Sequence, residues 1–472
     1  MRPLLPTLAL SMLTATATAE PALTIYRADG DALFAPGTAA LAEGHAIAHE
    51  TRALQLTGGR QTLVIDGLPV MLDSEAVAID LGSAARVLAQ RIIAPGDAGA
   101  LAAHRGENVR VIGADGQAIA EGTLVALDGA GLVVRASDGR IHYVRDFAQI
   151  EFAAGTGLPG STLQVAVEGR AGAATATLTY PTAGLGWRAA YAALLEDGSS
   201  CRLQLDALAS IANRSGRDWS GANLKLIAGS PNFARPGFAP RPMMKAAMAA
   251  DAPEGLPAQS ALGDYRSYAI GGSLDLPDAS ITQVPLYARS QRDCQRLWLV
   301  EQGSAWFPGK PMLTPTSGGD GRLPVDSRLT FVAQENLPAG TLRALTRDRD
   351  GRTEFLGEAR IADTPQGQEV DVSLGSAFAL SATREQTAFE VDRAARRLDE
   401  GVRYTLANAG EQARTITVRT HPNQWRNWTL VSSSEKPSQQ RPNLLEFKVQ
   451  VPAKGKATLD YAVRYTWTAA DE

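Results

Sequence analysis

Short runs in which apolar and polar residues alternate make up most of this chain. Residues 22–30 read ALTIYRADG, residues 49–69 read HETRALQLTGGRQTLVIDGLP, and residues 457–468 read ATLDYAVRYTWT. Gly, Pro, Asn and Asp separate the runs. A period of two places alternate side chains on one face, which is typical of β-strands that cover a core. The pattern therefore predicts a mainly β protein.

The alternating runs divide into three predicted regions. Residues 20–105 are expected to form an N-terminal β-sandwich-like domain, and residues 156–472 a C-terminal antiparallel β-sandwich region. Between them, residues 106–155 contain closely spaced short runs, from which we expect a small SH3-like barrel. Three Asp-Gly pairs separate these runs, namely Asp115-Gly116, Asp128-Gly129 and Asp138-Gly139. Asp-Gly is a strong hairpin signal because Gly adopts positive φ without steric cost.

Two segments do not follow the alternating pattern. Residues 231–263 are dense in Pro, Ala and Gly and lack apolar periodicity, which predicts a disordered excursion within the C-terminal region. Residues 388–401, AFEVDRAARRLDEG, have a composition that also fits a helix. Because alternating runs flank this segment on both sides, we expect it to be strand.

The first residues are typical of a cleavable signal peptide. A basic residue, Arg2, precedes an apolar stretch, and Ala17 and Ala19 match the small-residue pattern of a cleavage site. We therefore expect residues 1–19 to be removed and the protein to be periplasmic or secreted. The apolar stretch is shorter than the roughly 20 residues that a membrane helix needs, and no later segment qualifies. The sequence accordingly predicts no membrane span.

Charge and cysteine content narrow the possible partners. The formal net charge is −4 and no long run of either sign occurs, which argues against a nucleic-acid partner. The two cysteines, Cys201 and Cys294, each precede a predicted strand. They form a disulfide if those strands are adjacent, since export exposes them to an oxidising compartment. Two buried thiols that act as small apolar groups are an equally good interpretation.

No catalytic, cofactor-binding or metal-binding residue is predicted. The sequence has no Gly-x-Ser-x-Gly motif. His45 and His49 lie on a predicted strand, where residues four apart are roughly 13 Å apart and cannot share an ion. Asp348 and Asp350 resemble part of a calcium loop, but the other ligands are missing and the flanking runs favour a hairpin turn. Carboxylates brought together from distant strands would escape this linear analysis.

Two tryptophans are the only candidate ligand-binding residues. Trp425 and Trp428 lie in HPNQWRNWTL, residues 421–430. If exposed, paired aromatic side chains stack on sugar rings. If buried, they pack across or between sheets, which is the more usual role of large aromatic side chains.

Several motifs resemble a known family. They are a Trp-x-x-x-Tyr strand at Trp187 and Tyr191, an Asn-x-Ser-Gly turn from Asn213 to Gly216, and a hairpin that ends in Leu-Gly-Glu at residues 356–358. Together they resemble domain of unknown function family 4139, typified by proteins called mucoidy inhibitors, from about residue 160 to the end. The resemblance implies an exported β protein connected with the envelope or surface polysaccharide, and it brings no established catalytic residues. Relatives often carry a long coiled coil where this chain has the predicted barrel.

The residues that stand out in these motifs are apolar anchors and turn formers. We assign five of them to sandwich packing and strand connection: Trp187, Tyr191, Asn213, Gly216 and Trp219. The leading hypothesis is a non-enzymatic binding or structural component that presents rigid β surfaces to an envelope protein or polysaccharide. The alternatives are a carbohydrate-binding module and an enzyme that acts on glycan or peptidoglycan.

Overall fold

The computed structural model describes residues 20–37, 39–94, 106–128, 131–152, 160–196, 200–229, 258–263, 265–315 and 320–471. Strands contain 65% of the residues and helices contain 2%, so the predicted mainly β class is confirmed. The predicted signal peptide and most of the predicted excursion at 231–263 lie outside the described residues. Within the described ranges, no helix has the length and apolar character needed to cross a membrane.

The chain forms two compact units, which are described separately below. Unit 1 comprises Met1–Ala189 and Leu208–Tyr287, and unit 2 comprises Ala190–Ala207 and Ala288–Glu472. Strands β13 (Leu185–Glu196) and β14 (Arg202–Asn213) contribute residues to both units.

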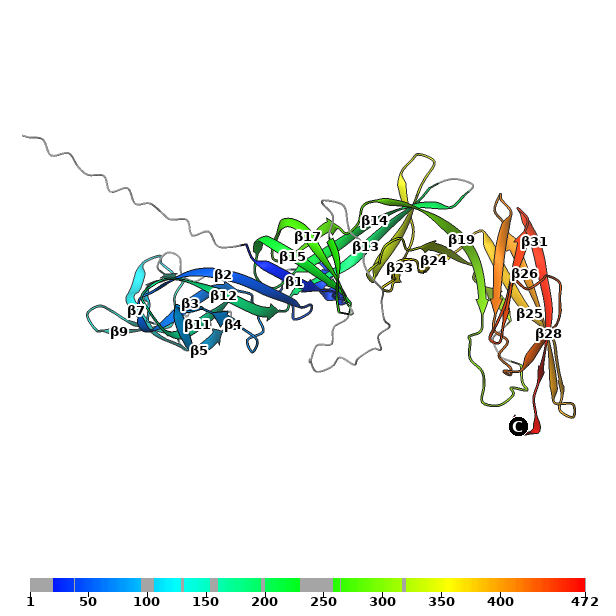
Figure 1. The fold of residues 1–472 in the computed structure, drawn as a ribbon, viewed down its shortest axis with the longest axis horizontal. Coiled ribbons are helices and arrows are strands. Elements are labelled where there is room, and N and C mark those ends of the chain that lie inside the picture. Colours follow the sequence, from blue (N-terminus) through cyan, green and yellow to red (C-terminus); the bar gives the residue numbers. More distant parts are fainter. Residues whose placement is uncertain are drawn as a thin grey trace, which may run out of the picture. The chain divides into compact units, whose positions relative to one another are not determined.

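Seven strands of unit 1 form one sheet (Figure 1). Across the sheet they are β16 (Ala258–Leu262), β17 (Tyr265–Leu276), β15 (Trp219–Ala228), β1 (Ala22–Tyr26), β2 (Ala46–Leu56), β12 (Gly172–Thr182) and β4 (Ala78–Asp80). Strand β1 is parallel to β15 and antiparallel to β2. The sheet therefore combines strands from both sides of the predicted boundary at residue 156. Alternation identifies strands, but it does not say which strands pair.

The other elements of unit 1 include a three-stranded sheet and a short helix. The sheet has the order β3 (Gly59–Leu68), β11 (Ser161–Gly169), β5 (Ala85–Ile93). On β11, Leu163, Val165 and Val167 are fully buried, as expected for alternate positions on one face. The helix, α1 (Asp31–Phe34), has a single turn that the alternating pattern did not predict.

Residues 108–152 form a third sheet, where we predicted a small SH3-like barrel. Its order is β10 (Gln149–Phe152), β6 (Asn108–Ile112), β7 (Ala118–Asp128), β8 (Gly131–Arg135), β9 (Ile141–Val144). The hairpin signals are confirmed at Gly116 and Gly139, whose φ angles are 76° and 86°. One buried cluster takes side chains from β6, β7, β8 and β9, and side chains of β10 pack against it, so the sheet curves around its own core.

This third sheet does not close into the predicted barrel. In the strands that are described, β9 and β10 share no ladder and remain the two edges. After β9 the backbone N–H of Ala148 donates to the carbonyl of Ile112, which attaches the returning chain to β6 instead. The five strands therefore curve around a shared core as expected, but the sheet stays open and is not a closed barrel.

The largest sheet has eleven strands, and part of it supplies one layer of a sandwich in unit 2. Its main path is β23 (Thr353–Ile361), β22 (Gly340–Arg347), β13, β14, β19 (Ser290–Gln302), β27 (Arg414–Thr420), β30 (Leu444–Val451) and β29 (Gln439–Arg441). Off this path lie β18 (Ser280–Pro285), β21 (Asp326–Val332) and β24 (Glu369–Ser376). Strand β19 is parallel to β27 and antiparallel to β21.

A five-stranded sheet supplies the second layer of unit 2, and its long strands lie side by side in Figure 1. Its order is β20 (Gly321–Leu323), β25 (Leu380–Asp392), β26 (Arg397–Asn408), β31 (Gly455–Thr466), β28 (Trp428–Ser433), and a short 3-10 helix, η1 (Ala469–Asp471), follows. One apolar cluster joins Ile416 and Phe447 of the large sheet to Tyr404 and Leu459 of the smaller one. The end of β19 with β27 and β30 therefore forms one layer of a two-layer sandwich, and β25, β26 and β31 form the other.

The structure describes one of the two irregular segments, residues 388–401, and the C-terminal end of the other, residues 231–263. The ambiguous segment 388–401 is not helical: it supplies the end of β25 and the start of β26, and residues 393–396 form the turn between them. The predicted excursion is too long at its C-terminal end. Ala258–Leu262 forms β16 and pairs with β17, so backbone hydrogen bonding there outweighs the turn-rich composition.

Candidate functional site

A small polar cavity lies between the two sheets of unit 2. Its volume is about 80 Å³, which suits a few waters or one small polar group and is far below the roughly 300–1,000 Å³ of a drug-sized ligand pocket. We call it the inter-sheet pocket. It is lined by Gln302, Gly303, Arg384, Gln386, Glu400, Thr420, His421, Pro422, Asn423, Gln424, Tyr461, Val463 and Tyr465.

Strand periodicity explains why polar side chains line this pocket. On β25, Leu380 and Ala382 face the apolar core, and the same face continues with Arg384 and Gln386. Residues two apart on a strand share a face, so polar residues at these positions enter the space between the sheets. The pocket therefore lies where the core-facing pattern changes from apolar to polar.

Glu400 is the buried carboxylate of the pocket, with an exposed fraction of 7%. Its Oε1 accepts hydrogen bonds from Arg384 Nη2 at 3.3 Å and Gln386 Nε2 at 2.9 Å, and its Oε2 accepts one from Tyr465 at 3.1 Å. Arg384 Nη1 also donates to Asp320 at 2.7 Å. Both oxygens of Glu400 are therefore committed to protein donors, as a buried carboxylate requires.

Buried phenols form a second part of the network. Tyr461 lies 3.2 Å from the hydroxyl of Thr420 and stacks on Tyr404 with a centroid distance of 6.4 Å. Burial raises the pKa of Tyr461 and of Tyr465 well above the usual value, and the negative charge of Glu400 adds to the rise. These hydroxyls consequently stay neutral and act as hydrogen-bond groups rather than as phenolates.

His421 lines the pocket, and its ring is held by two groups that do not line it. His421 Nδ1 lies 2.6 Å from the carbonyl oxygen of Asn443, and Nε2 lies 3.2 Å from Glu301 Oε1. Both ring nitrogens are thus engaged by groups outside the pocket lining. This arrangement orients the ring but offers no paired nucleophile of the kind that covalent catalysis needs.

The two candidate ligand-binding tryptophans do not form a platform for a sugar. Trp425 is 2% exposed and belongs to the core of unit 2. Trp428 is half-buried, packs against the same core, and donates from Nε1 to the carbonyl of Pro442 at 2.6 Å. An indole needs an accessible face to stack on a sugar, and Trp425 has none. The geometry therefore favours the packing interpretation.

The Asn-x-Ser-Gly motif forms a tight, buried turn in unit 1. Asn213 Oδ1 accepts from the backbone N–H and the hydroxyl of Ser215, while its Nδ2 donates to the carbonyls of Arg217 and Leu276. Gly216 has a φ of 76°, and a Cβ there would lie 2.3 Å from Val70 Cγ2. The motif thus connects strands, which requires Asn and Gly at these positions.

This turn holds a buried ion pair. Arg217 Nη1 and Nη2 donate to the two oxygens of Glu50 at 2.6 and 3.0 Å, and Arg52 donates to Glu50 at 2.8 Å. Tyr180 also donates to Glu50, and the guanidinium of Arg217 lies 4.2 Å above the ring of Trp219. Glu50 is 6% exposed. Sequence inspection missed this pair because Glu50, on β2, and Arg217, in the turn before β15, lie far apart in sequence.

Two further motif residues are core anchors. Trp187 is fully buried, donates from Nε1 to the carbonyl of Ile227 at 3.0 Å, and meets Tyr268 edge to face. Tyr191 is 2% exposed and donates to the carbonyl of Pro338 at 2.7 Å. Both side chains combine a large apolar surface with one satisfied polar atom.

We expect Trp187→Phe to destabilise unit 1 by about 1–2 kcal/mol, because the carbonyl of Ile227 loses its donor and the smaller ring leaves a gap. Chemical denaturation of the variant and the parent measures the difference. The matched control is Trp306→Phe, which changes an indole that is 56% exposed. Equal losses in both variants would contradict the assignment of Trp187 as an anchor.

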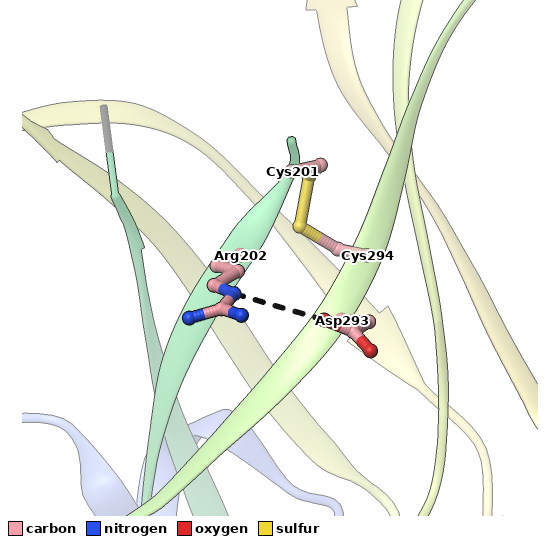
Figure 2. The surroundings of a disulfide bond; sticks show 4 residues. All are labelled: Cys201, Arg202, Asp293 and Cys294. Carbon is pink, nitrogen blue, oxygen red and sulfur yellow. Dashed lines mark ion pairs between the residues drawn. A yellow bond between two sulfur atoms is a disulfide. The ribbon is translucent and has the colours of Figure 1, made fainter. Parts of the chain in front are cut away.

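Cys201 and Cys294 are joined in a disulfide (Figure 2). The two residues lie at the start of β14 and within β19, where the backbone N–H of Cys294 donates to the carbonyl of Cys201 at 3.0 Å. Of the two interpretations of these cysteines, the structure contains the bridge. Next to it, Arg202 and Asp293 form an exposed ion pair at 3.9 Å.

The Asp348 segment is a hairpin turn between β22 and β23. The Asp348 carboxylate accepts from the backbone N–H groups of Asp350 and Arg352, each at 2.8 Å, and Gly351 has a φ of 78°. In the described part of the chain, no cluster of three or more His, Cys, Asp or Glu side chains has metal-site geometry.

Comparison with known proteins gives one match. The family model described as Domain of unknown function (DUF4139) matches residues 176–469, which is more than half of the chain. The matched range includes β13, β14 and every strand that lines the inter-sheet pocket. A search of the curated proteins found no match.

Proposed function

We propose that this chain, which belongs to the DUF4139 family, is an exported, non-enzymatic binding component of the bacterial envelope. It acts in the periplasm or after secretion, and its partner is an envelope protein or a polysaccharide. Unit 2 recognises a small polar group of that partner in the inter-sheet pocket.

The engagement of Glu400 carries this proposal. Its carboxylate accepts hydrogen bonds from three protein donors, which occupy three of its roughly four acceptor positions and hold the group in a structural network. The lining of the pocket also includes the amide residues Gln302 and Asn423. A small cavity lined by an ion-paired carboxylate and by amides suits hydrogen bonding to a hydroxyl, amide or carboxylate of a partner.

A second candidate, an enzyme that acts on glycan or peptidoglycan, has one observation in its favour. Asp320 and Glu400 bind opposite nitrogens of the same guanidinium, that of Arg384. Glycosidases use two carboxylates about 5–10 Å apart. However, the guanidinium of Arg384 lies between these two carboxylates, where the glycosidic bond of a substrate would have to lie. We therefore rank this function second.

We expect the mature chain to co-sediment with at least one of three probes, namely peptidoglycan sacculi, isolated surface polysaccharide and envelope vesicles. Gln302→Leu should weaken this binding roughly three- to tenfold, which is the effect of losing one neutral hydrogen bond. Gln440→Leu is the matched control, because Gln440 is an exposed glutamine on β29 outside the pocket. No co-sedimentation with any probe, or equal binding by the parent and Gln302→Leu, would contradict the proposal.

A further inference from the structure

Two arginines and a tryptophan form a cluster on β19 and β27 of unit 2. The guanidinium carbons of Arg414 and Arg296 lie 4.6 and 5.9 Å from the ring centroid of Trp298. Trp298 pairs with Ile416 in the parallel ladder, and each arginine lies two residues before one member of that pair. The two arginines therefore share one face and one end of neighbouring strands. We call this group the di-arginine cluster.

The cluster has positive charge without a matching negative charge. Across the described ranges, no carboxylate forms an ion pair with Arg296 or Arg414, although many other arginines of unit 2 have such a partner, among them Arg292, Arg328 and Arg384. Burial and the charge of Arg414 lower the pKa of Arg296 below its usual value. Two like charges held close together therefore cost free energy in the unliganded protein.

Cation–π stacking on Trp298 explains the position of Arg414 better than that of Arg296. Arg414 lies close enough to the indole of Trp298 for a favourable contact, while Arg296 lies near the limit of about 6 Å. A single guanidinium suffices to cover one indole face. The longer contact of Arg296 therefore offers less stacking energy to offset the nearby like charge.

An anion between the two guanidiniums would remove the repulsion. Arg296 Nη2 donates to the hydroxyl of Ser327 at 3.2 Å, so a third polar group lies at the same place. Guanidinium groups bind carboxylate, sulfate and phosphate oxygens through paired hydrogen bonds, which are stronger than neutral ones. The indole of Trp298 adds a wall that partly excludes water and strengthens these contacts.

We propose that Arg296 and Arg414, with Ser327 and Trp298, form a binding site for an oxyanion: a carboxylate, sulfate or phosphate group. This site differs from the inter-sheet pocket. Arg296 and Gln302 are six residues apart on β19, which corresponds to about 20 Å along an extended strand. The inference thus does not depend on the function proposed above.

Isothermal titration of the full mature chain tests the site, with sulfate, inorganic phosphate, glucuronate and polygalacturonate as probes at constant ionic strength in chloride. We expect the parent to bind at least one probe, and Arg296→Gln and Arg414→Gln each to weaken that binding by at least about tenfold. Arg403→Gln is the matched control, because Arg403 is a half-exposed arginine of unit 2 paired with Asp460. It should bind as the parent does.

The probes also separate two sources of the anion. Binding of the free ions supports a small-anion site, and binding of polygalacturonate alone supports a site for an acidic polymer. Absence of binding by the parent to every probe would overturn the inference. Equal affinity in the parent and both arginine variants would also overturn it. So would a lowered melting temperature of Arg414→Gln with unchanged affinity, because that result assigns the arginine to structural stacking.

Discussion

Glu50→Leu is expected to destabilise unit 1 by about 3–5 kcal/mol, which is the usual effect of removing one member of a buried ion pair. Glu50 accepts hydrogen bonds from Arg217, Arg52 and Tyr180. Without it, Arg217 retains a charge beneath the surface, with only neutral groups, the hydroxyl of Tyr180 and the indole of Trp219, in the contacts that remain. The large effect therefore comes from the charge left behind rather than from the lost contact alone.

Hydrogen exchange at the amides of β12 and β15 measures this change within unit 1. Arg217→Leu should cost a similar amount, because it leaves the carboxylate of Glu50 with fewer donors. The double variant should cost much less than the two single losses together, since it removes both charges. Additive losses would show that the two side chains do not act as a pair.

The same pair makes the stability of unit 1 depend on pH. Burial alone would raise the pKa of Glu50, but hydrogen bonds and charge from Arg217, with help from Arg52, lower it below the usual value of 4.5. A group whose pKa is lower in the folded state than in the unfolded state stabilises the fold at pH values above its unfolded pKa. This stabilisation is lost as the pH falls through the folded pKa. We expect the parent to lose stability below about pH 4.5 and Glu50→Leu to lose less of it.

Removal of the disulfide is the second large effect. Cys201 and Cys294 are 93 residues apart in sequence, and closing a loop of this length stabilises a fold by roughly 4–5 kcal/mol in the chain-entropy treatment. Cys201→Ala combined with Cys294→Ala should therefore lower the free energy of unfolding of unit 2 by about that amount. Denaturation of parent and variant under oxidising conditions provides the measurement.

The neighbouring ion pair supplies a control for the disulfide variant. Arg202→Gln removes an exposed contact to Asp293 and should change stability by less than about 1 kcal/mol. Titration of thiols in the unfolded, unreduced parent tests the bridge itself. Two reactive thiols per chain would contradict the bridge, and a double variant as stable as the parent would contradict its stabilising role.

Local patterns predicted most strands of this fold but not their partners. Alternation identified the run at residues 22–30, which contains β1, yet nothing in that run indicates that β1 pairs in parallel with β15. The same limit explains the open five-stranded sheet. Its strands and Asp-Gly turns are local features, whereas closure depends on contacts between β9 and β10 that turn residues do not specify.

The inter-sheet pocket escaped sequence analysis for a related reason. Arg384, Gln386 and Glu400 each lie in a polar-rich stretch that resembles a solvent-facing strand. The alternation along β25 does contain a signal. Arg384 and Gln386 occupy the alternate positions that continue the apolar face of Leu380 and Ala382. Recognising it requires knowing which face of β25 meets the other sheet, and that information comes from the fold.

The tryptophans show how chemistry and packing compete for one residue type. Trp425 and Trp428 looked like candidates for sugar binding because of their spacing, but large apolar side chains gain most by burial. The structure places Trp425 in the core and leaves Trp428 half-buried. The recognition that we propose for unit 2 therefore relies on polar side chains that the linear motif did not include.

The measurement that tests the central claim most directly is product analysis after prolonged incubation of the parent with sacculi and isolated polysaccharide. The proposed binding function requires that the probes are recovered bound but chemically unchanged, with no new reducing ends or released fragments. The opposite result is fragment release by the parent that disappears in a well-folded Glu400→Gln variant. That outcome would assign Glu400 to catalysis and replace the binding function with an enzyme.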